Sequence, residues 1–417
     1  MEQLSTMVNF KENLKRIKER WLSSEEKFLP ELKRIGDNEK KKGQKALASL
    51  LKQIDKEVKN NRQIKKVTAL NEVDEALKNR LEGYIRDFIS EDNIFGLKNL
   101  SEERKKDFFK CTEEFLESSK AFDQSLSMED IGQALRNVWI INILQAVMGE
   151  KVRLTSAILG YSLLYPYTDN FLDDSSISRE DKMEFNNRLM CRLKGERLTP
   201  FNSHEEKVYA LVELIEKDFH REEYRELYLA LQYINLGQIE SVKQQYSPGN
   251  IFPIGREELL DISLLKGGSS VLVDGYLVRG RLTHEEIDFS LGYGFMLQLG
   301  DDLQDVEEDY SNSHITLMTS DISKGSLDLM ATKLINFTVS LIQNLSCADK
   351  GEEIGLKEMI KINCIMLVLF SVVKAKGYFS SEYINSLKVH LPYSIDHIEG
   401  LREKISKWYK TSNSSLL

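Results

Sequence analysis

The chain has 417 residues, which is enough for one large domain or two of modest size. Its composition, 41% hydrophobic and 29% charged, is typical of a soluble globular protein, and only 6 prolines interrupt a sequence rich in helix-forming residues. The net charge of −9 argues against nucleic acid as the main partner, because phosphate backbones bind basic surfaces.

Residues 1–120 are rich in lysine and glutamate and show helical periodicity. Leu14, Ile17 and Trp21 fall on one side of a helix, which predicts solvated helices that pack by one face. Further along the chain the predicted helices are apolar on most faces, as expected at the centre of an α-domain. We therefore expect a charged N-terminal helical region over residues 1–120 and an all-α domain over residues 121–417. The first region is compatible with a dimer arm, a lid support or a degenerate second domain.

A first group of acids follows a long uncharged segment. Residues 154–168 carry no charge and run directly into DNFLDD, residues 169–174. Asp169 and Asp173 are one helical turn apart on one face, and Asp174 lies round the side. Two carboxylates at this spacing are too few to hold magnesium, which usually keeps waters and takes further ligands from a substrate phosphate. The pattern predicts half of a site for a metal-bound diphosphate.

A second group of acids has the same design. Residues 289–300 are uncharged and run into DDLQDVEED, residues 301–309, and Gln298 lies on the acidic side one turn earlier. Like charges at this spacing repel unless a cation neutralises them, and oxygen-only ligands favour magnesium over zinc or copper. We expect the two half-sites to face each other across an apolar cavity. Five carboxylates share an arc of about 120° on such a helix: Asp301, Asp302, Asp305, Glu308 and Asp309.

The longest apolar run, residues 362–373, covers about two-thirds of a membrane span and predicts a buried helix instead. Residues 1–21 are amphipathic and charged, without the apolar core of a signal peptide. We therefore expect a cytoplasmic protein without a transmembrane segment. The cysteines are far apart and form no CxxC pair, which favours reduced thiols over a disulfide framework or a zinc site: Cys111, Cys191, Cys347 and Cys364.

The two acidic segments resemble motifs of a known superfamily. Residues 297–305, LQLGDDLQD, resemble the second aspartate-rich motif of trans-polyprenyl diphosphate synthases, and DNFLD at 169–173 resembles the first, with Asn170 in place of its second aspartate. QLGDDLQDVEED is similar to a motif of squalene and phytoene synthases. Asp301, Asp305 and Asp309 have the i, i+4, i+8 spacing of a metal motif in terpene cyclases. All belong to the class I isoprenoid synthase superfamily. The resemblance, over about residues 130–320, implies a helical bundle around a central apolar cavity.

The same resemblance implies roles for other residues. LGQIE at 236–240 resembles the Gly-Gln segment of the family's central helix, which singles out Gln238, and Lys266 in LLKGGSS resembles the lysine that contacts the diphosphate. Magnesium ions, which we take as three, would bridge the acids and the diphosphate, and Arg179 would add positive charge beside the leaving group. Aromatic faces would stabilise an allylic cation: Tyr161, Tyr165, Tyr293 and Phe295.

Two departures from the family pattern favour one branch. Head-to-tail prenyltransferases hold a second diphosphate with an Arg-Arg pair after the first motif and a Gly-Gly-Lys-Arg segment, whereas this chain has only Arg179, followed by Glu180 and Asp181. The expected function is therefore a terpene synthase that cyclises or rearranges one prenyl diphosphate of C15 to C20 size. A prenyltransferase with substitute bases (Arg136, Lys151 and Arg153) and a catalytically silent partner subunit stay open, as does a homodimer.

Overall fold

A computed structural model describes residues 2–60, 75–92, 94–174, 176–244, 254–322, 325–345 and 352–413. Within these ranges the chain forms helices and no strand, which confirms the predicted all-α class. No helix in the described part combines the length and the apolar run needed to cross a bilayer. Cys111, Cys191 and Cys364 are free thiols, and Cys347 lies outside the described residues.

The first half of the chain contains α1 (Glu2–Leu22), α2 (Asp37–Asn60), α3 (Glu75–Glu91), α4 (Glu102–Phe122), α5 (Met128–Val147), α6 (Ser156–Asp173), α7 (Arg179–Leu193) and α8 (Ser203–Asp218). The second half contains α9 (Arg225–Ser241), α10 (Arg256–Ser263), a π-helical turn (Leu264–Gly268), α11 (Ser269–Arg279), α12 (His284–Gln304), α13 (Val306–Ser311), α14 (Leu317–Ile322), α15 (Asp328–Gln343), α16 (Glu352–Lys374), α17 (Ser381–Leu387) and α18 (Ile395–Asn413).

Polar caps start the apolar helices at the centre of the bundle. The Ser127 side chain accepts a hydrogen bond from the Asp130 amide at the start of α5, and the Asp130 carboxylate accepts one from the Ser127 amide. Thr283 and Glu286 form the same reciprocal box at α12, and Thr155 caps α6. Each cap satisfies amide groups that the first helical turn leaves without partners. The start of each central helix is therefore set locally by sequence.

The helix α6 runs through Pro166 and does not begin there. Proline lacks the amide that would bond the Ser162 carbonyl, so the ladder loses one hydrogen bond at this point. The helix nevertheless continues to Asp173, which keeps Asp169 on a helical turn.

The helix α12 is the central element and packs against α1, α11, α15 and α16. Its Phe295 is fully buried and meets two rings edge-on, Trp21 of α1 at 5.5 Å and Phe337 of α15 at 5.6 Å between centroids. Aromatic pairs of this geometry contribute about 0.5–1.5 kcal/mol each beyond the burial of their area. The first helix of the chain is therefore part of the core around α12.

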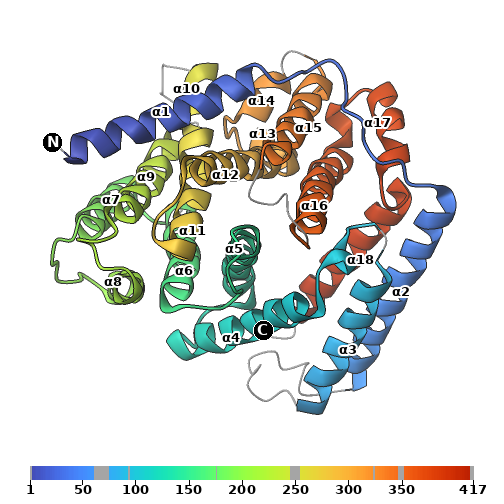
Figure 1. Ribbon diagram of the computed structural model, residues 1–417, viewed down its shortest axis with the longest axis horizontal. Helices are drawn as coiled ribbons and strands as arrows, with labels where there is room; N and C mark the ends of the chain where they lie inside the picture. Colours follow the sequence, from blue (N-terminus) through green and yellow to red (C-terminus); the bar gives the residue numbers. More distant parts are fainter. Residues whose placement is uncertain are drawn as a thin grey trace.

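The N-terminal region divides into two parts. Figure 1 shows α1 along the upper left of the bundle and the pair α2 and α3 at its lower right edge. Ion pairs join α1 to the bundle, from Arg16 to Asp288 at 2.7 Å and from Lys18 to Asp261 at 2.6 Å. The predicted region 1–120 thus contains α1 and α4, which pack into the bundle, and a helical pair at its edge.

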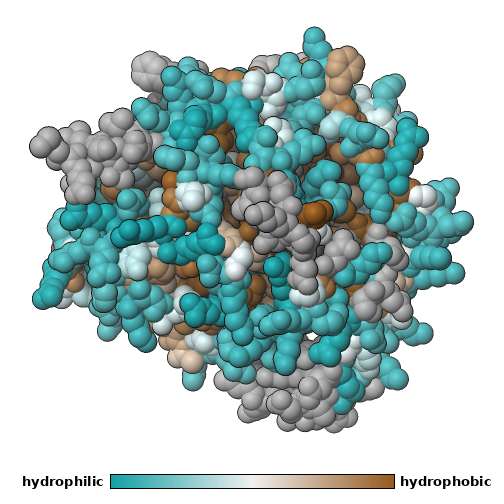
Figure 2. Space-filling model, viewed as in Figure 1, coloured by the Kyte–Doolittle hydropathy of each residue, from teal (hydrophilic) through white to brown (hydrophobic). Residues whose placement is uncertain are grey.

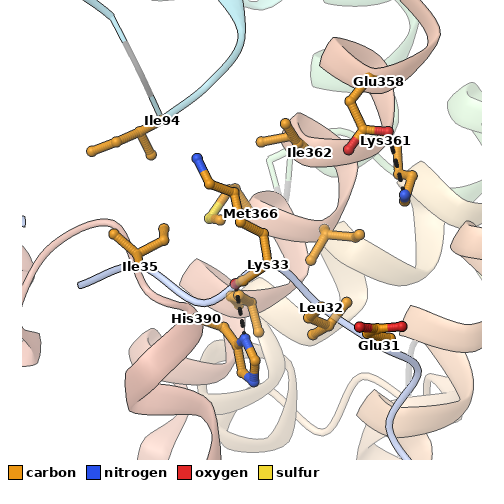
Figure 3. A pocket seen from close by; sticks show the side chains of 12 residues that line it. Glu31, Leu32, Lys33, Ile35, Ile94, Glu358, Lys361, Ile362, Met366 and His390 are labelled. Carbon is orange, nitrogen blue, oxygen red and sulfur yellow. Dashed lines mark hydrogen bonds and ion pairs between the residues drawn. The ribbon is translucent and has the colours of Figure 1, made fainter. Parts of the chain in front are cut away.

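The link between α1 and α2 lies against α16 and leaves an apolar hollow there (Figure 3). Leu32 and Ile35 of the link face Ile362 and Met366 of α16 across this hollow. The His390 ring forms a hydrogen bond of 2.9 Å with the carbonyl oxygen of Lys33 in the link. None of the predicted site residues lines this hollow. On the face shown in Figure 2, the coloured surface is mostly hydrophilic, with hydrophobic residues in small separate areas.

Glycines let neighbouring helices touch the π-helical turn that carries Lys266. A Cβ on Gly237 of α9 would lie 2.8 Å from the Lys266 Cα, and one on Gly294 of α12 would lie 2.0 Å from the Gly267 carbonyl oxygen. Contacts this short do not occur, so a larger residue at either position would force the helices apart. The packing fixes the backbone of Lys266 between α9 and α12. Segments of π-helix are frequent at functional sites.

Candidate active site

The ends of the uncharged segments in α6 and α12 converge. Burial raises the pKa of Asp301; the positive charge of Arg136 opposes this, and the Asp169 carboxylate adds to it. Tyr165 is within electrostatic range of the same three groups and of Lys266, and burial followed by the Asp169 charge raises its pKa. Asp169 of the first acidic segment and Asp301 of the second therefore lie in one site, together with Tyr165.

Water reaches Asp301 although protein surrounds it. Asp301 is exposed to solvent, yet the protein atoms around its carboxylate are the largest cause of its raised pKa. The two observations agree if the carboxylate is surrounded by protein on most sides and open to solvent on one. Both Asp169 and Asp301 also lie near helix C-termini, where the helix dipole adds about half a negative charge. The site therefore attracts cations more strongly than its carboxylates alone would.

Lys266 stands beside the first acid. Its ammonium nitrogen is 3.5 Å from Asp169 Oδ1, and both side chains are mostly buried. Gln238 of α9 is buried next to the same helix end, where its amide donates to Thr168 Oγ1 at 3.4 Å. The two residues that the family resemblance singled out are thus placed at the end of α6.

Asp302 is the most buried acid of the second segment, with 7% of its surface exposed. Gln298 donates to its Oδ1 at 2.9 Å, and no group among the described residues hydrogen-bonds its Oδ2. Burial raises the pKa of Asp302 to about 7, and the charges of Asp309 and Asp301 add to this. A buried carboxylate oxygen without a partner calls for a proton or a cation.

The two remaining aspartates of the segment are paired with bases, and Glu308 is exposed. The Lys374 ammonium at the end of α16 is 2.7 Å from Asp305 Oδ1, and the His314 ring nitrogen is 3.1 Å from Asp309 Oδ1. Asp305 ends α12, and α13 begins directly after it. We call Asp169, Asp301, Asp302, Asp305 and Asp309 the acid cluster.

Other predicted residues lie away from the acid cluster. Asp174 ends α6 with an exposed side chain that accepts from the Ser176 amide at 2.8 Å, and Arg179 is exposed at the start of α7. The Tyr161 hydroxyl donates to the Ser270 carbonyl at 3.1 Å in the core. Phe295 contacts Trp21 and Phe337, as described above. Tyr293 stacks on Phe289, and the side chain of Asp173 lies outside the described part of the chain.

Asn170, which stands where the family motif has an aspartate, has a partner of its own. Its amide donates to Asp130 Oδ1 at 2.9 Å, and the other oxygen of Asp130 caps α5. An aspartate at position 170 would place two carboxylates against each other. The asparagine thus ties the end of α6 to the start of α5.

Two bases of the site were poorly predicted from the sequence. Arg136, which entered only as a substitute base, exerts the largest charge effect on Asp301. Lys374 was missed, although the sequence contains a signal: it is the first charged residue after the uncharged run 362–373. Three uncharged segments are thus followed by charged residues at one site. Residues 154–168 and 289–300 are followed by acids, and residues 362–373 are followed by a base.

The donor set of the acid cluster is made of oxygen, which suits a hard divalent cation. Among the described residues, no three acid, histidine or cysteine side chains lie close enough together to hold a metal ion by themselves. A cation here would take further ligands from water or from a phosphate. No family model matches the chain, and no curated protein or solved structure matches it either.

Proposed function

We propose that the chain is a magnesium-dependent class I terpene synthase that ionises an allylic prenyl diphosphate of C15 to C20 size and cyclises or rearranges it. The convergence of Asp169 and Asp301 at the ends of two uncharged segments, with Lys266 beside Asp169, carries this proposal. The apolar cavity and the isoprenoid synthase-like bundle are part of the same proposal.

The acid cluster would hold the magnesium ions, with the unpartnered Oδ2 of Asp302 as one candidate ligand. When bound, magnesium supplies Lewis-acid stabilisation of the leaving diphosphate. Lys266 would release Asp169 to the cation and donate a charge-assisted hydrogen bond to a diphosphate oxygen. Asp169 would then bind the cation and Lys266 would bind the diphosphate, so each side chain meets a group of opposite charge.

The reaction itself is a bond cleavage followed by rearrangement. The carbon–oxygen bond breaks, and its electron pair leaves with the diphosphate. The apolar residues of α6 and α12 would exclude water from the allylic cation, and Tyr165, which is within electrostatic range of Asp169 and Asp301, would stabilise positive charge near the diphosphate. Loss of a proton gives a hydrocarbon, and capture of water gives an alcohol.

A prenyltransferase is the second candidate, and Arg136 favours it. A second diphosphate carries two to three negative charges and needs arginines or lysines held in place. Arg136 is close enough to Asp301 to lower its pKa, so at least one such base is present at the acid cluster. The exposed position of Arg179 at the start of α7 provides no second one there.

Product analysis separates these functions. Purified protein and magnesium are incubated with C10, C15 and C20 allylic diphosphates, with and without isopentenyl diphosphate, and the extracts are analysed by gas chromatography and mass spectrometry. We expect a hydrocarbon or alcohol plus inorganic diphosphate from one allylic substrate alone. A lengthened prenyl diphosphate that forms only with both substrates would establish the prenyltransferase. No product from any combination would favour the silent subunit.

A further inference from the structure

We infer that Lys374 is a built-in counter-ion of the second acidic segment: a divalent cation displaces it from Asp305, and its ammonium then binds the diphosphate. This inference rests on the proposed function and assigns to the same site a residue and a step that the family resemblance does not supply.

The ion pair between Lys374 and Asp305 is close but open to solvent. The ammonium nitrogen lies 2.7 Å from Asp305 Oδ1, and the two side chains are 32% and 43% exposed. Exposed ion pairs stabilise a protein by about 1 kcal/mol or less. A divalent cation, which interacts with a carboxylate at shorter distance and with twice the charge, therefore competes with the ammonium at small cost.

The packing of α16 on α12 fixes the stem of Lys374 beside the acids. A Cβ on Gly300 would lie 3.3 Å from the Leu367 side chain, and the Ser371 hydroxyl lies 3.4 Å from the Gly300 carbonyl oxygen. Lys374 lies one helical turn after Ser371 in α16, and Asp305 lies little more than one turn after Gly300 of α12. The helix register thus brings the two side chains together, and only the flexible end of Lys374 has to move when the pair opens.

A second observation points to a cation at the same place. Asp302 Oδ2 is buried and has no hydrogen-bond partner among the described residues, three positions before Asp305. Lys374 pairs with Asp305 Oδ1 and does not hydrogen-bond this oxygen of Asp302. A cation bound to Asp302 would also attract the Asp305 carboxylate and so release the Lys374 ammonium. The ammonium would then lie beside the cation, where a diphosphate oxygen would complete the coordination shell.

Manganese binding tests this exchange without turnover. Binding of Mn²⁺ alone is measured by electron paramagnetic resonance, and binding of inorganic diphosphate at saturating Mn²⁺ is measured by calorimetry. The variants are Lys374→Met, which keeps the length of the stem, and Lys374→Arg, which keeps the charge. Lys376→Met is the matched control, because Lys376 lies two residues further on and pairs with Glu399.

We expect Lys374→Met to bind Mn²⁺ alone about three- to fivefold more tightly, the range that an exposed ion pair is worth. The same variant should bind diphosphate about tenfold more weakly, because one charge-assisted hydrogen bond is lost. Lys374→Arg should stay within about threefold of the parent for diphosphate, and Lys376→Met should match the parent in both measurements.

The opposite signs of the two effects distinguish an exchange from a structural role. Equal weakening of both affinities in Lys374→Met, or no change in either, would overturn the inference while leaving the proposed function intact. A parent protein that binds neither Mn²⁺ nor diphosphate would overturn the proposed function and the inference with it.

Discussion

The two acidic segments share a sequence pattern but differ in what they bring to the site. The first contributes Asp169 among its described side chains, while Asn170 bonds Asp130 and Asp174 turns to Ser176. The second contributes its aspartates at 301, 302, 305 and 309, each in electrostatic contact with another charged group of the site. The side chain of Asp173, the other predicted ligand of the first segment, lies outside the described part of the chain.

The two segments also differ in what the backbone does after the first acid. The helix α6 ends at Asp173, and the chain turns away at Asp174. After α12, helical hydrogen bonds continue across the break, from the Asp305 amide to Asp301 and from the Asp309 amide to Asp305. Carboxylates four residues apart therefore stay on one side. Helical geometry therefore extends over all four aspartates of the second segment, whereas it ends at Asp173 in the first.

Removal of the acids predicted to hold the metal should have the largest effect. Asp169→Ala, Asp173→Ala and Asp301→Ala should each lower turnover by about two orders of magnitude or more, the scale of losing a charge-stabilising group. Activity should also disappear in EDTA. Asp174→Ala is the control from the first segment, because its side chain bonds Ser176, and it should keep most of the activity.

Full activity in EDTA would contradict the metal site. Thermal unfolding of the same variants shows whether the fold survives, which we expect because relief of carboxylate repulsion is neutral or favourable. If Asp174→Ala were as inactive as Asp169→Ala, the contrast between the two segments would be lost.

The buried acid of the second segment should make the metal-free protein sensitive to pH. The folded carboxyl of Asp302 has a pKa of about 7 against an ordinary 3.8, so between about pH 4 and 7 the folded state binds the extra proton. Stability therefore falls as the pH rises through this window. Asp302→Asn cannot ionise and should abolish a fall on the order of 2 kcal/mol.

Urea unfolding in EDTA at pH 5 and pH 8 measures this effect. The amide oxygen of Asp302→Asn can still accept from Gln298, which preserves the observed hydrogen bond. An equal loss of stability in parent and variant between these pH values would show that another group is responsible.

The first segment can be made more like the family motif by one change, Asn170→Asp. The motif alone predicts unchanged or higher activity. The structure predicts a loss of about 1 kcal/mol in the free energy of unfolding, because a hydrogen bond to Asp130 is replaced by carboxylate repulsion. Urea unfolding at neutral pH and steady-state turnover are measured together. Unchanged stability would show that the bond to Asp130 contributes nothing.

Two tyrosines on α6 should give the smallest effect. Tyr165 lies within electrostatic range of the acid cluster, so Tyr165→Ala should shift substrate preference by a few-fold towards a chain longer by one C5 unit. Tyr161→Phe removes only the hydroxyl bond to Ser270 and should leave the preference unchanged. Competition between C15 and C20 diphosphates measures the substrate preference of each variant. Identical profiles for both variants would place Tyr165 in ordinary core.

Local sequence predicted some features of the site and could not predict others. The helical class and the acids at two helix ends follow from patterns within single segments. Phe295 was assigned to the site because α12 is apolar on most faces, so its sequence does not tell which face meets α1. Lys374 was missed because its pair with Asp305 depends on how α16 packs against Gly300. Pairings between distant helices are tertiary information.

The contact of Trp21 with Phe295 and Phe337 also has a consequence for synthesis. The first helix is completed before any of its partners exists, and Phe337 follows roughly 300 residues later. At a translation rate of about 5–20 residues per second, that interval is about 15–60 s. Phe295 is made before Phe337, and until then Trp21 has neither of its two native phenylalanine rings to pack against. The nascent chain therefore carries an exposed aromatic surface until α15 has left the ribosome, which makes α1 a natural binding segment for chaperones.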